Sequence, residues 1–146
     1  MGTGPLKPRI NFVTLGVTDM AAMRAFYERL GLVSSSASNP HVTFFDANGI
    51  VLGLFGYHEL AEDAAVKAGP VPAFRGVGVA WNAETEKAVD QIMVHAKSAG
   101  AIITKKAQKV FWGGYSGYFA DPEGNLWEVA FNPFMPLDAQ GHVQLP

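Results

Sequence analysis

The chain has no cysteine and no long apolar run. The lack of cysteine excludes disulfides, thiolate nucleophiles and Cys-ligated zinc, and it suits a cytoplasmic protein. The densest apolar stretch, "GIVLGLFG", is far shorter than the roughly 20 residues needed to cross a bilayer, and "MGTGPLKPRI" lacks the apolar core of a secretory signal. We therefore expect a soluble cytoplasmic protein that does not bind membranes.

Charge is also sparse, and neither sign dominates. Charged residues make up 16% of the chain, the formal net charge is -2, and Lys and Arg form no run. A nucleic-acid partner, which would need a basic surface, is not expected. Small molecules or other proteins remain as partners. With 146 residues, 49% of them hydrophobic, the chain fits one domain over residues 1–146.

Two parts of the chain repeat one order of elements. In the first part, apolar patterns and turn residues predict a strand, a helix that Thr18 or Asp19 can cap, a Ser-rich edge stretch and two strands: 10–17, 20–30, 32–38, 41–45 and 50–56. The second part predicts the same order: 74–81, 83–100, 101–106, 114–120 and 125–131. Each part places an Asp-x-x-Gly turn before its last strand, at 46–49 and at 121–124.

This duplication predicts an α+β fold of two β-α-β-β-β modules. Module 1 spans about 10–57 and module 2 about 73–133, with a connector at 58–72 and a tail at 134–146. Neither module alone has enough residues for a core of its own, so both belong to one domain. We expect their half-sheets to join into a curved mixed sheet around a cleft, with the helices outside and a ligand between the repeats.

Glu128 is the one charged residue of the stretch 126–131. Alternation along a strand separates Leu126, Glu128 and Ala130 from Trp127, Val129 and Phe131. The second set suits a core covered by helices, so we expect Glu128 to face the cleft, opposite Phe12 and Thr14 of the first strand. Three roles stay open for Glu128: a remnant bonded to neighbours or water, an acceptor for a ligand's hydroxyl or amine, or a catalytic base.

Two segments, "LGVTDMAAMRAFYERLGL" and "YFADPEGNLWEVAFNP", resemble the vicinal oxygen chelate superfamily of glyoxalase I, bleomycin-resistance proteins and extradiol dioxygenases. The resemblance extends from about Ile10 to Pro133. It implies the glyoxalase/bleomycin-resistance/dioxygenase fold and a tendency to form homodimers. The superfamily includes lyases, isomerases, dioxygenases and non-catalytic binders, so the fold does not select an activity.

The resemblance also implies which residues would hold a divalent metal. Four positions related by the repeat supply the ligands in metal-dependent members, and here they carry Phe12, Gly53, Gly76 and Glu128. A shift of two residues would offer Thr14, Leu54 or Gly78 instead. Because Zn, Fe or Mn sites of this type need several imidazole or carboxylate donors, we expect no metal cofactor, with a divalent metal as the alternative.

Aromatic residues gather around glycines in "KVFWGGYSGYFADP". Trp112, Tyr115 and Tyr118 can line the cleft, or they can seal the end of the sheet or form a dimer contact. His58 follows a strand that lines the cleft and can reach inward, although a surface position is the alternative. Candidate ligand-binding residues are therefore Phe12, Thr14, Gly53, His58, Gly76, Trp112, Tyr115, Tyr118 and Glu128.

These residues favour a protein that binds or sequesters an apolar or aromatic compound without metal. The alternative is a glyoxalase-like lyase or dioxygenase-related enzyme that uses Glu128, with His58 or a tyrosine. A third possibility is a protein-interaction module with a collapsed cleft.

Overall fold

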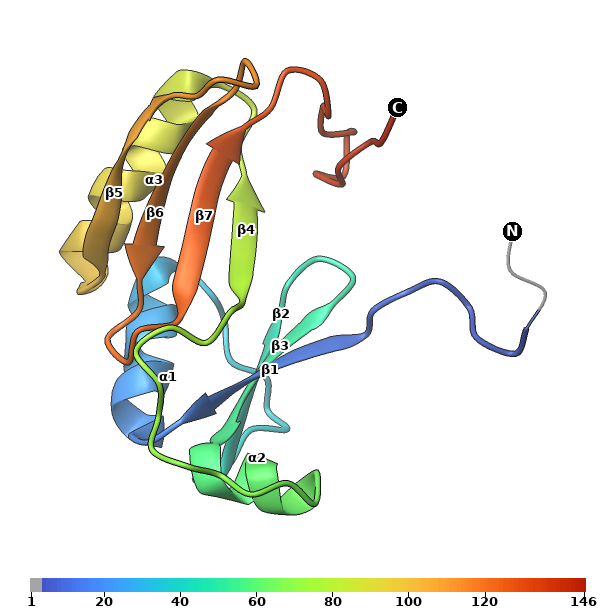
Figure 1. Cartoon of the computed structure of the whole chain (residues 1–146), viewed down its shortest axis with the longest axis vertical. Coiled ribbons are helices and arrows are strands. Elements are labelled where there is room, and N and C mark those ends of the chain that lie inside the picture. The colour runs from blue at the N-terminus through green and yellow to red at the C-terminus, as the bar shows by residue number, and fades with distance from the viewer. Residues whose placement is uncertain (1–3) are drawn as a thin grey trace.

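The computed structural model describes residues 4–146, which form the two predicted modules (Figure 1). Module 1 contains β1 (Phe12–Val17), α1 (Met20–Leu30), β2 (Val42–Asp46) and β3 (Val51–Gly56). The short α2 (Tyr57–Asp63) leads into the connector. Module 2 contains β4 (Gly78–Asn82), α3 (Glu86–Ala99), β5 (Ile102–Lys109), β6 (Tyr115–Ala120) and β7 (Leu126–Phe131). The predicted α+β class is confirmed.

The half-sheets stay separate within this chain. Module 1 has the strand order β1-β3-β2 and module 2 the order β4-β7-β6-β5. In each sheet the first strand of the module runs parallel to the last, and the other pairs are antiparallel. Strands β1 and β4 are consequently edge strands. Figure 1 shows β4 at the side of its sheet that lies away from β5.

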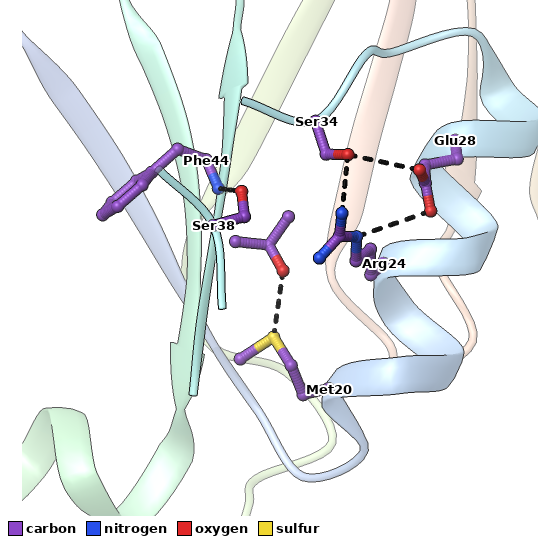
Figure 2. A network of polar contacts seen from close by, with 7 residues as sticks. Met20, Arg24, Glu28, Ser34, Ser38 and Phe44 are labelled. Atoms are coloured by element: carbon purple, nitrogen blue, oxygen red, sulfur yellow. Dashed lines mark hydrogen bonds and ion pairs between the residues drawn. The ribbon is translucent and has the colours of Figure 1, made fainter. Parts of the chain in front are cut away.

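The Ser-rich stretch predicted as an edge strand forms only one isolated bridge, between Ser34 and Phe45. Its serines are held by side-chain hydrogen bonds instead (Figure 2). The Arg24 guanidinium donates to Ser34 Oγ at 2.9 Å, and the Phe44 N–H donates to Ser38 Oγ at 3.0 Å. Serine side chains compete in this way with backbone pairing, which explains why no full fourth strand forms in module 1.

Both long helices begin and end at the residue types that the sequence offered. Asp19 Oδ1 accepts from Ala22 N and Thr85 Oγ1 from Ala88 N, each at 3.0 Å. Gly31 and Gly100 end the helices with φ values of 123° and 114°, which glycine adopts without strain. Of the two predicted caps of α1, Asp19 is the one used.

One hydrophobic core lies between the modules. Residues Leu15, Phe45 and Leu54 from the first sheet and Phe119, Trp127 and Val129 from the second belong to the same buried cluster. Helices α1 and α3 contact each other, and α3 packs on β5, β6 and β7. Since both sheets turn their apolar side toward this shared core, their other faces point away from it.

A buried polar group fixes the modules to each other. The Tyr27 hydroxyl on α1 donates to Asp121 Oδ2 at 2.6 Å and accepts from Trp127 Nε1 at 3.0 Å. Burial, followed by the charge of Asp121, raises the pKa of Tyr27 well above its ordinary value. Glu123, from the turn between β6 and β7, accepts from the backbone N–H of Thr18 at 2.7 Å and of Asp19 at 2.9 Å. The turn of module 2 thereby caps the first helix of module 1.

The tail returns to module 1 after β7. Asn48, in the β2–β3 turn, donates through Nδ2 to Gln140 O at 2.6 Å. His142 Nε2 lies 3.2 Å from Asn48 O. The tail therefore joins the far ends of the two modules. None of the helices within residues 4–146 is long and apolar enough to span a bilayer.

Candidate functional site

The face of the four-stranded sheet that is free of helices carries Glu128, as strand alternation predicted. Trp127 and Val129 are buried in the core, whereas Glu128 is half-buried on the opposite side. Glu128 pairs with Ala80 on β4 and with Tyr118 on β6. We call this the Glu128 face, and pairing places on it Ala80, Ser116, Tyr118, Leu126, Glu128 and Ala130.

Tyr118 and Glu128 form the polar centre of the Glu128 face. Burial, then the negative charge of Glu128 and hydrogen bonding to it, raises the pKa of Tyr118 above its ordinary value. The phenol is consequently neutral near pH 7 and can donate, while the carboxylate can accept. Lys105 on β5 pairs with Tyr118 and is exposed. Sequence reasoning missed Lys105 because register shifts in β5 break its simple alternation.

The matching face of module 1 is apolar. Thr14 pairs with Gly53, which pairs with Phe44. The Phe12 and Phe44 rings meet edge to face with centroids 6.0 Å apart, and Phe12 is 56% exposed. We call this the Phe12 face, made of Phe12, Thr14, Phe44, Gly53 and Phe55.

The predicted cleft between these two faces is not closed by one chain. Both faces lie opposite the shared core, on separate sheets. Two hollows on the chain, of about 490 Å³ and about 330 Å³, are lined by neither Phe12 nor Glu128. The structure therefore brings Tyr118 to Glu128, and Thr14 and Gly53 to Phe12, but it does not bring the two groups together.

The register of the strands shows which residue of module 2 corresponds to Phe12 of module 1. Phe12 pairs with Val51, two residues before Gly53, and Gly78 pairs with Leu126, two residues before Glu128. Asp19 and Thr85, the two helix caps, lie seven residues after Phe12 and Gly78. The counterpart of Phe12 is thus Gly78, and Gly76 lies before β4 with a φ of 70°.

These positions do not fit a divalent metal. Phe12, Gly53 and Gly78 have no side-chain donor, so Glu128 is the one potential ligand of the four. Across residues 4–146, no group of three or more His, Cys, Asp or Glu side chains is arranged to hold an ion.

Tyr115 and Trp112 lie away from the centre of the Glu128 face. Tyr115 pairs with Phe131 on the helix side of the sheet and donates to Asp90 Oδ1 on α3 at 2.7 Å. That hydrogen bond raises the pKa of Tyr115. Tyr115 and Tyr118 are three positions apart along the strand, so the two rings fall on opposite faces. The Trp112 ring covers Gly114, whose missing Cβ makes room for it.

His58 lies at the start of α2, beside a hollow of about 330 Å³ that His41 and Glu59 also line. Its ring meets that of Tyr57 edge to face, with centroids 5.4 Å apart. The hollow contains neither Glu128 nor Tyr118, so His58 is separated from the Glu128 face within one chain.

Fold and sequence together define the class of protein. The profile of the Glyoxalase/Bleomycin resistance protein/Dioxygenase superfamily matches residues 9–129, and the chain belongs to this superfamily. A search of curated proteins found no match.

Solved structures of relatives have the same fold. A glyoxalase-related enzyme from Fulvimarina pelagi is 33% identical, with a TM-score of 0.85 over 95% of this chain and 99% of its own. A glyoxalase/bleomycin resistance protein/dioxygenase from Nocardioides is 25% identical, with a TM-score of 0.76 over 99% of this chain and 93% of its own. A lactoylglutathione lyase from Agrobacterium tumefaciens, at 24% identity, has a TM-score of 0.67 over 88% of this chain and 96% of its own, a likeness of fold alone.

Proposed function

We propose that this chain is a cytoplasmic protein that binds a small apolar or aromatic molecule without a metal ion. One observation carries the proposal: the positions at which the family resemblance implies metal ligands carry, after alignment by strand register, Phe12, Gly53, Gly78 and Glu128. The Phe12 ring offers apolar contact, and the two glycines leave space for a ligand. Glu128 is then the one carboxylate among the four positions. Pockets for organic ligands have this composition, with few polar groups among apolar ones.

The two faces offer complementary contacts to such a molecule. On the Glu128 face, the Tyr118 hydroxyl can donate and the Glu128 carboxylate can accept, which fixes the orientation of a ligand's polar group. On the Phe12 face, the Phe12 and Phe44 rings supply stacking surface, and Gly53 leaves room above the sheet. A Cβ at Gly53 would lie 3.2 Å from Thr14 Oγ1 and would narrow that space.

A second copy of the chain would complete the site. The Phe12 face is unusually apolar for a surface, with Phe12 56% and the adjoining Ile10 68% exposed. A homodimer that joins the Phe12 face of one copy to the Glu128 face of the other would bury these rings and enclose a ligand. Light scattering should give the mass of a dimer, and Phe12→Ser should shift the population toward monomer. A monomeric wild-type protein would contradict this arrangement.

Native mass spectrometry of protein purified without a tag tests the binding function. We expect an organic molecule to copurify, and its affinity, measured by calorimetry, to fall at least about tenfold in Glu128→Gln because a hydrogen bond to a charged acceptor is lost. Glu62→Gln, on the exposed side of α2, is the matched control and should bind as the wild type does. The proposal fails if no molecule copurifies and a panel of aromatic compounds shows no saturable binding.

The pairing of Tyr118 with Glu128 supports one alternative, an enzyme of the glyoxalase or dioxygenase type. A carboxylate beside a neutral phenol can exchange a proton with a substrate. Turnover of methylglyoxal-glutathione adducts or catechols that is lost in Glu128→Gln would establish it. Absence of turnover in both panels would leave the binding function as the better account.

A further inference from the structure

A groove of about 490 Å³ lies between the modules, on the side of β4 that faces the core. We call it the inter-module groove. Its walls come from the two sheets and from the tail, and they include Val13, Leu52, Val79, Trp81, Trp127 and Val143. Because Val79 and Trp81 alternate with Ala80 along β4, these side chains point away from the Glu128 face. The groove adjoins the Glu128 face at Ala80, which borders both, but it contains neither Glu128 nor Tyr118.

The floor of the inter-module groove is aromatic. Trp81 and Trp127 meet with ring centroids 5.7 Å apart at an angle of 47°. Strand β4 is the edge of its sheet, so backbone groups of its free side also border the groove. A volume of this size, with apolar walls and a few polar groups at the rim, is typical of a site for a small organic molecule.

The polar residues at the rim of the inter-module groove favour a positively charged ligand. No Lys or Arg lines the inter-module groove, and its one carboxylate is that of Asp46, with Asn48, Asn82 and His142 as the other polar side chains. Asp46 is exposed, and its Oδ1 accepts from Asn48 N at 3.2 Å. Indole faces attract cations, and a carboxylate at the rim adds to that attraction. An anionic ligand would find no Lys or Arg side chain there.

The tail supplies a fixed third wall. Asp138 Oδ1 accepts from Gln140 N and from His142 N, each at 2.9 Å, which shapes the turn, and Leu137 bridges to Val143. Asn48 Nδ2 binds Gln140 O and so attaches this turn to module 1. A wall that is held in place before binding costs less ordering entropy when the ligand arrives.

We propose that the inter-module groove is a second binding site, for a planar aromatic molecule that carries an amine. The ring lies against Trp81 and Trp127, and the ammonium group lies toward Asp46. This site goes beyond the function proposed for the Glu128 face and does not depend on it.

Titrations of the full-length 15N-labelled protein with tryptamine and with indole-3-acetate test this proposal, because the two probes share a ring and differ in charge. Tryptamine should bind saturably and shift the indole N–H signals of Trp81 and Trp127 and the amides of residues 141–143. Indole-3-acetate should bind at least about tenfold more weakly, as expected when a charge is attracted in one case and unpaired in the other. Equal affinities, shifts centred on Tyr118 and Glu128, or no saturable binding would each overturn the proposal.

Matched variants separate the contribution of the Asp46 charge from that of the tail. Asp46→Asn should lower tryptamine affinity about tenfold and should not weaken the binding of indole-3-acetate, whose carboxylate the Asp46 charge repels. Asn48→Gly should weaken binding by releasing the tail, and it adds no backbone strain because Asn48 has a φ of 62°. Asp63→Asn, on exposed α2, should bind as the wild type does. Unchanged tryptamine affinity in Asp46→Asn would contradict the assignment.

Discussion

At the scale of single residues, the proposed role of Glu128 depends on Tyr118, the residue with which it pairs on the neighbouring strand. Alternation along the last strand predicted its facing correctly, because one buried face leaves little freedom of register. Its partner Tyr118 was a candidate from sequence alone, although nothing in the sequence distinguished it from Tyr115. The distinction comes from the register of β6, which turns Tyr118 toward Glu128 and Tyr115 toward α3.

Glu128→Gln should lower the pKa of Tyr118. The negative charge of Glu128 and hydrogen bonding to it contribute to the raised pKa, and an amide removes the charge. Titration of 13C-labelled tyrosine followed by NMR measures this directly, with the Tyr115 resonance as an internal reference. An unchanged Tyr118 titration would show that the two side chains do not interact.

Tyr27→Phe should destabilise the fold by about 1–3 kcal/mol near neutral pH, because a buried hydrogen bond is lost. The raised pKa of Tyr27 means that the unfolded state loses its proton first, so the contribution of Tyr27 is complete below the ordinary pKa of about 10 and declines above it. The difference in the free energy of unfolding between wild type and Tyr27→Phe should therefore become smaller as the pH rises beyond that value. Urea unfolding of both proteins at several pH values measures this difference. A difference that grows with pH would contradict the proposed contribution of the Tyr27 hydroxyl.

At the scale of elements, sequence patterns predicted the two long helices and most strands because each had a cap, an apolar stripe or a turn residue. Gly31 and Gly100 end their helices as expected. The Ser-rich stretch failed as a strand, since Ser34 and Ser38 bond to a helix side chain and a backbone N–H that cannot be identified from local sequence. Gly78 was an alternative that a shift of two residues offered, and strand pairing favours it over Gly76 as the counterpart of Phe12.

Glu123→Ala should weaken α1, since Glu123 accepts from the backbone N–H of Asp19 at the N-terminus of that helix, 104 positions away in the sequence. We expect a loss of about 1–2 kcal/mol in the free energy of unfolding, the usual effect of removing a cap. Chemical denaturation measures it, with Glu62→Ala on α2 as the control. Glu123→Gln should keep part of the stability through its remaining oxygen, and equal losses in both variants would count against capping.

At the scale of the whole molecule, the duplication predicted two modules and a cleft, but the way one chain arranges its modules was not predictable. The apolar sides of both sheets meet in one core around Tyr27 and Trp127, which turns the Phe12 face and the Glu128 face outward. Long-range packing of this kind depends on contacts between distant segments, which a local pattern does not encode. The same arrangement opens the inter-module groove.

Elemental analysis of the protein, purified without chelators or a metal-binding tag, tests the central claim most directly. A protein with Phe12, Gly53 and Gly78 at three of the four positions that the family resemblance implies should carry far less than one Zn, Fe, Mn or Ni per chain. One equivalent of such a metal, present in the wild type and lost in Glu128→Gln, would contradict the account.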